Sequence, residues 1–335
     1  MRALVVVPGG LEVADLPDPH AADGAVVVAV HSCGICGSDV HGVERGAARP
    51  GQVLGHEFSG TVVEAGAGAR GWVAGQAVAV NPLGGCGSCD VCAQGLPFLC
   101  DRRPNLGLTA PGGLAELVAV PHDQLVALPE GVDPEVGAHA EPLAVALHAL
   151  DLAGPAPGDA ALVYGVGPIG LKVIVALRAA GAGTIVAVGR SPGRRAAAAA
   201  AGADVVLDSR ETDVAGYAAE AGLTFRQVFE CSAAPDAVVA CVPTLSVGGT
   251  LVEVALPGAP AAVDLRRFVG RNLHLAGSCA FGPDDYARAV EMLTAGAIDL
   301  EPLVSERVPL AAAPDAFVRL RRPEHLVGVL VQPWR

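Results

Sequence analysis

Positive charge and long apolar runs are both scarce in this sequence. Lysine and arginine total 22 of 335 residues against 35 acidic residues, which gives a formal net charge of −13. Nonspecific nucleic-acid binding needs a basic surface, so this balance argues against it. The best membrane-span candidate, 160–180, is interrupted by glycine, proline, lysine and arginine. The stretch 1–7 is too short for a signal sequence and predicts a strand, so we expect a cytoplasmic protein.

Cysteine occurs nine times, and without an export signal these thiols favour metal binding or catalysis over disulfides. Four of them, Cys86, Cys89, Cys92 and Cys100, fall within 15 residues on a glycine-rich stretch. Zinc takes four thiolates in a tetrahedron, and closely spaced cysteines on a loop supply them. Four protein ligands leave no place for a substrate, so we predict a structural zinc. An iron–sulfur cluster is the alternative.

The pattern of predicted elements changes near residue 140. Before it, short apolar runs between turn residues predict a small barrel-like β domain, with strands at 3–7, 25–30, 60–64, 77–80 and 117–120. After it, strands alternate with helices as in a doubly wound dinucleotide fold, with strands at 160–164, 184–188, 204–207, 227–230, 250–254 and 273–276. A helix at 284–295 and short strands ending in 326–331 complete the chain.

A G-x-G-x-x-G stretch, G-V-G-P-I-G, follows the first of these later strands and opens a predicted helix. In this context Gly165 permits a tight turn, Gly167 lets the backbone approach a pyrophosphate, and Gly170 lets the helix pack on the strand. Pro168 and Ile169 belong to the same predicted contact. The pyrophosphate meets the helix N-terminus. The sequence therefore predicts a dinucleotide site.

The end of the second strand of this fold bears on which dinucleotide binds. An NAD site usually has an acid there, for the ribose hydroxyls. Here no acid follows, and the stretch contains Gly189, Arg190, Arg194 and Arg195. The glycine leaves room and the arginines can meet a 2′-phosphate. A solvated helix start is the other interpretation, but arginine is poorly placed at a helix N-terminus. We favour NADP over NAD.

A second group of metal-ligand residue types lies earlier in the chain. Cys36 opens the stretch C-G-S-D-V-H, and His56 and Glu57 follow about 20 residues later in G-H-E. Cysteine, histidine and glutamate are all good zinc ligands. Each also has an ordinary interpretation, as a small buried residue, a hydrogen-bonded core histidine and a surface acid.

Together, these motifs resemble the zinc-containing medium-chain dehydrogenase/reductase family. The C-G-S-D-x-H stretch, G-H-E, the four cysteines, E-P-L-A from Glu141 and G-x-G-P-I-G occur in the family's order along the whole chain. The resemblance implies an α/β protein with a GroES-like β-barrel catalytic domain and a Rossmann doubly wound parallel-sheet domain. We expect the catalytic domain at 1–140, with the cysteine lobe, the Rossmann domain at 141–279, and a return to the catalytic domain at 280–335.

The resemblance also implies that Cys36, His56 and an acid hold a catalytic zinc, which makes two zinc ions per chain. Glu141 stands where alcohol dehydrogenases of the family have a cysteine, as in the sorbitol, threonine and butanediol dehydrogenase branch. In that branch Glu57 also ligates, and the two glutamates alternate around a bound water. The departure from cysteine moves the expected substrate from ethanol-like alcohols toward polyols, hydroxy-amino acids or sugar-like compounds.

The remaining roles follow from the same resemblance. Asp39 fixes the tautomer of His56, Ser38 takes the substrate hydroxyl proton, and His41 passes that proton to solvent through the coenzyme ribose. The expected reaction moves a hydride between a secondary alcohol and NADP or NAD. A zinc-free quinone or enone reductase of the same fold and a non-catalytic dinucleotide sensor are the alternatives. The family also implies a homodimer or homotetramer.

Overall fold

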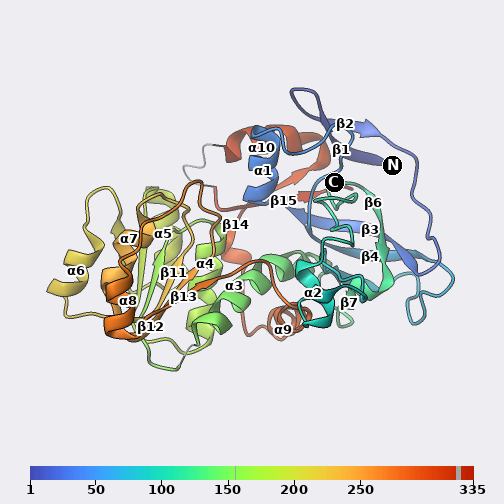
Figure 1. Ribbon diagram of the computed structural model, residues 1–335. Helices are drawn as coiled ribbons and strands as arrows, with labels where there is room; N and C mark the ends of the chain where they lie inside the picture. The colour runs from blue at the N-terminus through green and yellow to red at the C-terminus, as the bar shows by residue number, and fades with distance from the viewer. Residues whose placement is uncertain (155, 322–325) are drawn as a thin grey trace.

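The computed structural model describes residues 1–154, 156–321 and 326–335. Figure 1 shows two lobes, with the chain running through the right-hand lobe, then the left-hand lobe, and back again. One lobe contains a seven-stranded, mostly antiparallel sheet, and the other a six-stranded parallel sheet. No helix among the described residues is long and apolar enough to cross a membrane.

The mostly antiparallel sheet combines strands from both ends of the chain. Its path is β14-β15-β3-β4-β5-β7, and β6 also pairs with β3. β1 and β2 form a separate hairpin beside it. The bounds are β1 Arg2–Val7, β2 Gly10–Asp15, β3 Ala25–Gly34, β4 Glu57–Ala65, β5 Ala77–Val80, β6 Leu117–Pro121, β7 Leu125–Ala127, β14 Val304–Pro309 and β15 Gly328–Gln332. Every strand predicted for the first part of the chain is present, whereas β2 and β7 were not predicted.

The parallel sheet has the strand order β10-β9-β8-β11-β12-β13. The order reverses between β8 and β11, and a dinucleotide binds at such a switch point, beyond the carboxyl ends of the strands. The strands are β8 Ala161–Tyr164, β9 Ile185–Gly189, β10 Val205–Asp208, β11 Phe225–Glu230, β12 Leu245–Glu253 and β13 His274–Gly277. The accompanying helices are α4 Pro168–Ala179, α5 Pro192–Ala200, α6 Val214–Glu220, α7 Ala237–Cys241 and α8 Leu265–Arg271.

Helix α3, Ala140–Ala153, connects the two lobes (Figure 1). Its apolar side chains share one buried core with α4 and with α9, Pro283–Thr294. The other helices are α1 Gly37–Glu44, α2 Asp90–Ala93 and α10 Ala313–Leu320. None of α1, α2, α3 and α10 was predicted from the sequence, where the stretch from Cys36 was given no helix. Cys36 instead caps the start of α1.

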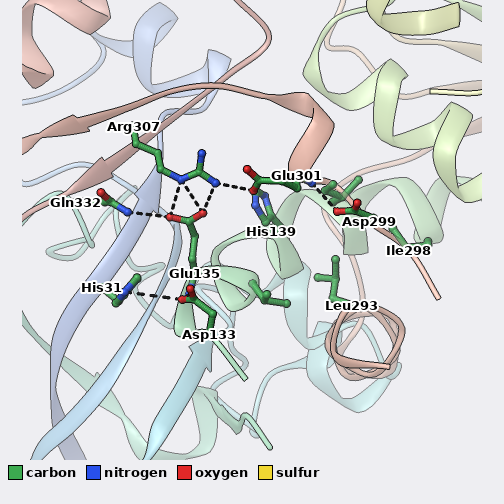
Figure 2. A pocket seen from close by; sticks show the side chains of 12 residues that line it. His31, Asp133, Glu135, His139, Leu293, Ile298, Asp299, Glu301, Arg307 and Gln332 are labelled. Carbon is green, nitrogen blue, oxygen red and sulfur yellow. Dashed lines mark hydrogen bonds and ion pairs between the residues drawn. The ribbon is translucent and has the colours of Figure 1, made fainter. Parts of the chain in front are cut away.

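A network of charged groups ties the C-terminal strands to the first lobe, around a cavity of about 430 Å³ (Figure 2). Arg307 of β14 contacts the carboxylate of Glu135 at 2.6 Å, and Gln332 of β15 donates to the same carboxylate at 2.9 Å. Glu301 also pairs with Arg307, at 2.5 Å. Because these groups satisfy one another, the network fixes the returning segment in place.

Candidate active site

The start of helix α1 sets the direction of four predicted site residues. The backbone N–H of Cys36 donates to Asp39 Oδ2 at 3.1 Å, as in a capping box. This bond turns Asp39 inward, where its side chain is fully buried. Ser38 and His41 lie on the exposed side of the helix. The predicted proton-transfer residues thus face solvent, while the predicted orienting residue faces the protein interior.

Strand pairing brings Glu57 beside the segment that contains Cys36. Glu57 begins β4 and pairs with Gly34, the last residue of β3. The carboxylate of Glu57 occupies the space that a Cβ on Gly34 would fill. Any side chain at position 34 would therefore displace Glu57. Sequence reasoning missed this glycine, because its role depends on the strand register.

Cys36, His56 and Glu57 each offer a ligand atom, and these atoms all lie within 4.8 Å of one another. His56 is 5% exposed, and its Nδ1 lies 3.5 Å from Oδ1 of Asp39. Neither of these two atoms has a hydrogen bond to another described residue, so each has the other as its partner. The arrangement leaves the second ring nitrogen of His56 for a metal, and the sulfur, nitrogen and oxygen donors suit zinc.

Buried charges perturb the ionisation of this cluster. Burial alone lowers the pKa of His56, but Asp39 and Cys36 outweigh it and raise that pKa well above its usual value. Burial raises the pKa of the Cys36 thiol, and the charge of Glu57 adds to the effect. A bound cation counters such shifts, since metal binding releases protons from its ligands.

Glu141 lies in the first turn of α3, outside the 4.8 Å group. Burial is the main cause that raises the pKa of its carboxyl, to about 8; His56 and Lys172 oppose the rise and Glu57 adds to it. Lys172 is the only lysine in the sequence, and it is 93% buried in α4. Sequence reasoning gave it no role, although its uniqueness was visible. Its ammonium lies close enough to Glu141 to oppose the rise in the pKa of that carboxyl.

His41 has an ordered partner within its own helix. Its Nδ1 lies 3.4 Å from a carboxylate oxygen of Glu44, which was not predicted. Ser38 precedes His41 by three residues, so the two side chains share one helix face. This spacing is compatible with the predicted transfer of a proton from Ser38 to His41.

The four cysteines of the second cluster also bring their sulfurs within 4.8 Å of one another, and none is in a disulfide. Backbone N–H groups point at two of them, from Cys86 to the Cys100 sulfur at 3.4 Å and from Cys92 to the Cys89 sulfur at 3.5 Å. A hydrogen bond from Ser88 lowers the pKa of Cys86 to about 6. These donors favour thiolates, which are the form that binds metal. At Cys89 the N–H of Cys92 lowers the pKa of the thiol, but burial and the neighbouring cysteines outweigh it and raise that pKa to about 11.

The glycine loop joins β8 to α4, as the sequence predicted. Gly165 has φ +104°, and a Cβ on it would lie 2.6 Å from the backbone nitrogen of Ser232. Gly170 packs against the carbonyl of Gly165. At Gly167 a Cβ would meet only the guanidinium of Arg194, at 4.0 Å. The backbone at Gly167 is therefore open to a ligand, with Pro168 following it as the first residue of α4.

The end of β9 differs in part from the prediction. A Cβ on Gly189 would collide with the side chain of Val166, so packing explains this glycine better than space for a phosphate. Arg195 pairs with Asp208 at 3.0 Å, and Arg194 donates to the carbonyl of Leu326 at 3.3 Å. Arg190 is exposed and makes no hydrogen bond or ion pair with the described residues. Of the three arginines, Arg190 is therefore the one whose guanidinium is available to a ligand.

Models of known protein families match both lobes. Residues 22–130 match the alcohol dehydrogenase GroES-like domain, and residues 168–295 match the zinc-binding dehydrogenase family. A relative from Pseudoalteromonas atlantica, 2-dehydro-3-deoxy-L-galactonate 5-dehydrogenase, is 33% identical over 89% of this chain and 88% of its own length. The chain belongs to the zinc-containing medium-chain dehydrogenase/reductase family. The predicted fold class, a GroES-like domain with a Rossmann domain, is confirmed.

Other relatives agree with this family. Sorbitol dehydrogenase 1 of Saccharomyces cerevisiae is 33% identical over 90% of this chain and 87% of its own length. A zinc-binding dehydrogenase from Sinorhizobium meliloti, solved with NADP bound, has a TM-score of 0.93 and is 32% identical, covering 99% of both chains. The chain itself is therefore an oxidoreductase that interconverts an alcohol and a ketone.

Proposed function

We propose that the chain oxidises a secondary alcohol of a polyol, sugar-like compound or amino alcohol to the ketone, and catalyses the reverse reduction, with NADP in preference to NAD. The observation that carries this proposal is the clustering of Cys36, His56 and Glu57 beside the exposed pair Ser38 and His41. Such a set offers metal ligands and a proton path at one place. The glycine loop of the parallel sheet supplies the coenzyme site.

We assign the catalytic zinc to Cys36, His56 and Glu57, with Glu141 as the alternate ligand, and the structural zinc to the four-cysteine cluster. The donor types and the unshared Asp39–His56 contact support this assignment. When bound at these residues, the zinc would supply Lewis-acid polarisation of the alcohol oxygen, and the coenzyme would supply the hydride acceptor or donor. Asp39 holds the ring of His56, and Glu57 is kept in place by the absence of a side chain on Gly34.

In this proposal Ser38 accepts the hydroxyl proton of the substrate at its Oγ, and His41 delivers the proton to solvent. The exposure of both side chains and the contact of His41 with Glu44 support this path. These groups also argue against the alternatives. A zinc-free reductase does not need the metal ligands Cys36, His56 and Glu57, and a dinucleotide sensor does not need a path for protons.

A metal and substrate survey tests the proposed function. The purified chain should contain two zinc ions, and polyols, diols, amino alcohols and their ketones should be turned over with at least one coenzyme. One zinc per chain, or turnover of enones alone, contradicts the proposal. The relatives named for sorbitol and for a deoxy sugar acid support starting the panel with these compounds.

The coenzyme preference rests on Arg190, which we propose as the contact of the 2′-phosphate. Replacing Arg190 by alanine should raise the KM for NADP about tenfold or more, since a hydrogen bond to a charged group contributes about 1.5–3 kcal/mol. The KM for NAD should change little. Steady-state kinetics with both coenzymes measures this difference.

Arg266→Ala is the matched control, because Arg266 is a strongly exposed arginine of α8 that pairs with Asp264, the N-cap residue of that helix. It should leave both KM values unchanged. An unaltered NADP preference in Arg190→Ala removes Arg190 from the coenzyme site.

We further propose the division 1–140, 141–279 and 280–335, which is supported by the pairing of β14 with β15 and of β15 with β3. A homodimer or homotetramer is proposed as well, because β13 is an edge strand with exposed Leu275, and Leu265 and Val269 of α8 are 70% and 85% exposed. Light scattering measures the assembly.

A cytoplasmic location is proposed on the nine free cysteines.

A further inference from the structure

Two carboxyl side chains meet at the carboxyl edge of the parallel sheet, away from both metal clusters. Glu230 ends β11 and Glu253 ends β12, and the two residues are register partners. Register partners on adjacent strands point to the same face of a sheet. Glu230 is 1% exposed, and both carboxyl oxygens of Glu253 are shielded from solvent. The two groups contact each other, and the described residues offer Glu253 no hydrogen-bond donor.

Glu230 holds the turn that follows its own strand. Its Oε1 accepts from the backbone N–H of Ser232 at 2.8 Å and also from the Ser232 hydroxyl, and its Oε2 accepts from the N–H of Ala233 at 3.1 Å. These bonds keep Ala233 at φ +55°, which is unfavourable for a residue with a Cβ. Since Ser232 abuts Gly165, the carboxylate of Glu230 fixes one wall of the coenzyme loop.

Two buried carboxyl groups in contact cannot both be charged at low cost. Burial and the neighbouring Glu230 together raise the pKa of Glu253 to about 8. Glu230 accepts three hydrogen bonds, whereas Glu253 accepts none from the described residues. At neutral pH the proton therefore belongs to Glu253, whose O–H can donate to Glu230.

The other ionisable groups around the pair do not replace this proton. Burial raises the pKa of the Cys231 and Cys241 thiols well above the usual value, so both stay neutral. Tyr164, the register partner of Glu230 on β8, also has a raised pKa, through burial and then through nearby Cys241 and Asp236. Arg190 lowers the pKa of this tyrosine, and within the described part of the chain it makes no ion pair with either glutamate.

We propose that Glu253 is a positioning residue of the coenzyme site. As a neutral acid it donates a hydrogen bond to Glu230, which holds the Ser232–Ala233 turn against Gly165. Loss of the Glu253 proton at alkaline pH loosens the turn and weakens coenzyme binding. Deprotonation places two like charges in contact, and Glu230 relieves the repulsion by moving away from the turn. The inference rests on the proposed coenzyme site.

Coenzyme titrations of the whole protein test this proposal. The dissociation constants of NADPH and NADH are measured by their fluorescence between about pH 6 and about pH 10, which brackets the pKa of about 8. For the wild-type protein, the affinity for the coenzyme that binds more tightly should fall about tenfold as the pH rises across this range. Glu253→Gln keeps a donor but cannot ionise, so its affinity at neutral pH should match the wild type and vary less than about twofold with pH.

Glu253→Leu provides a second comparison, because it is neutral but donates nothing. It should bind weakly throughout and show no pH dependence. Equal pH profiles for the wild type and Glu253→Gln, or wild-type affinity in Glu253→Leu at neutral pH, overturn the proposal.

Infrared spectroscopy separates this proposal from the coenzyme assignment. At neutral pH the wild-type protein should show the carbonyl absorption of buried, protonated carboxyl groups, and Glu253→Gln should lose the part that Glu253 contributes, while the part from Glu141, whose pKa is also raised to about 8, remains. If neither coenzyme binds, the proposed function fails, while this band still reports on the pair. Identical infrared spectra overturn the shared proton whether or not a coenzyme binds.

Discussion

Replacing Cys36 by serine should lower turnover by about a thousandfold or more, because the catalytic metal contributes several kcal/mol of charge stabilisation. A serine hydroxyl is a far weaker zinc ligand than a thiolate. The fold should persist, since Cys36 caps α1 and serine is a favoured capping residue. Zinc content should fall from two ions per chain to one. Steady-state kinetics, metal analysis and circular dichroism measure the three quantities.

Cys279→Ser is the matched control for this substitution. Cys279 is exposed and belongs to neither cysteine cluster, so its replacement should leave activity and zinc content unchanged. Activity that survives in Cys36→Ser contradicts the catalytic assignment. Lost activity with two zinc ions retained indicates a role for Cys36 other than holding metal.

Replacing Cys100 by serine should have its largest effect on stability. The lobe around Cys100 contains only the four-residue α2 and a three-residue turn, and neither has a buried residue. With so little apolar packing, the lobe depends on its metal for order, and structural zinc contributes folding free energy directly. We expect loss of one zinc and a melting temperature about 10 °C lower.

Calorimetry and limited proteolysis test the effect at Cys100. Cleavage should begin within the cysteine-rich stretch, because the rest of the first lobe keeps its own apolar core. Cys279→Ser again serves as the control. An unchanged melting temperature together with two retained zinc ions contradicts the structural assignment.

Local patterns in the sequence were sufficient for most of the strands. The strand predicted at 77–80 is β5 itself, because turn residues bound its apolar run on both sides. The prediction started β12 at 250, but the strand begins at Leu245 before a register shift. Helix α3 escaped prediction because it is buried around most of its circumference and lacks the usual polar face.

The residues of the candidate site were predictable where a short, continuous sequence motif contains them. Cys36, His56 and the glycine loop belong to short motifs of this kind. Gly34, Lys172 and Glu253 do not, because their significance comes from strand register and helix packing that join distant segments. Gly189 shows the converse limit, since the sequence showed a glycine but not the side chain of Val166 that requires it.

The pairing of β3 with β15 has a consequence for how the molecule is made. Cys33 pairs with Val331, about 300 residues away, and the N–H of Ile35 bonds to the carbonyl of Val329. The strand that leads into Cys36 therefore gains this neighbour only when β15 has been synthesised. Closing so long a loop is slow and leaves apolar strand edges exposed meanwhile. We expect the metal-ligand cluster to assemble late, after the parallel sheet has folded.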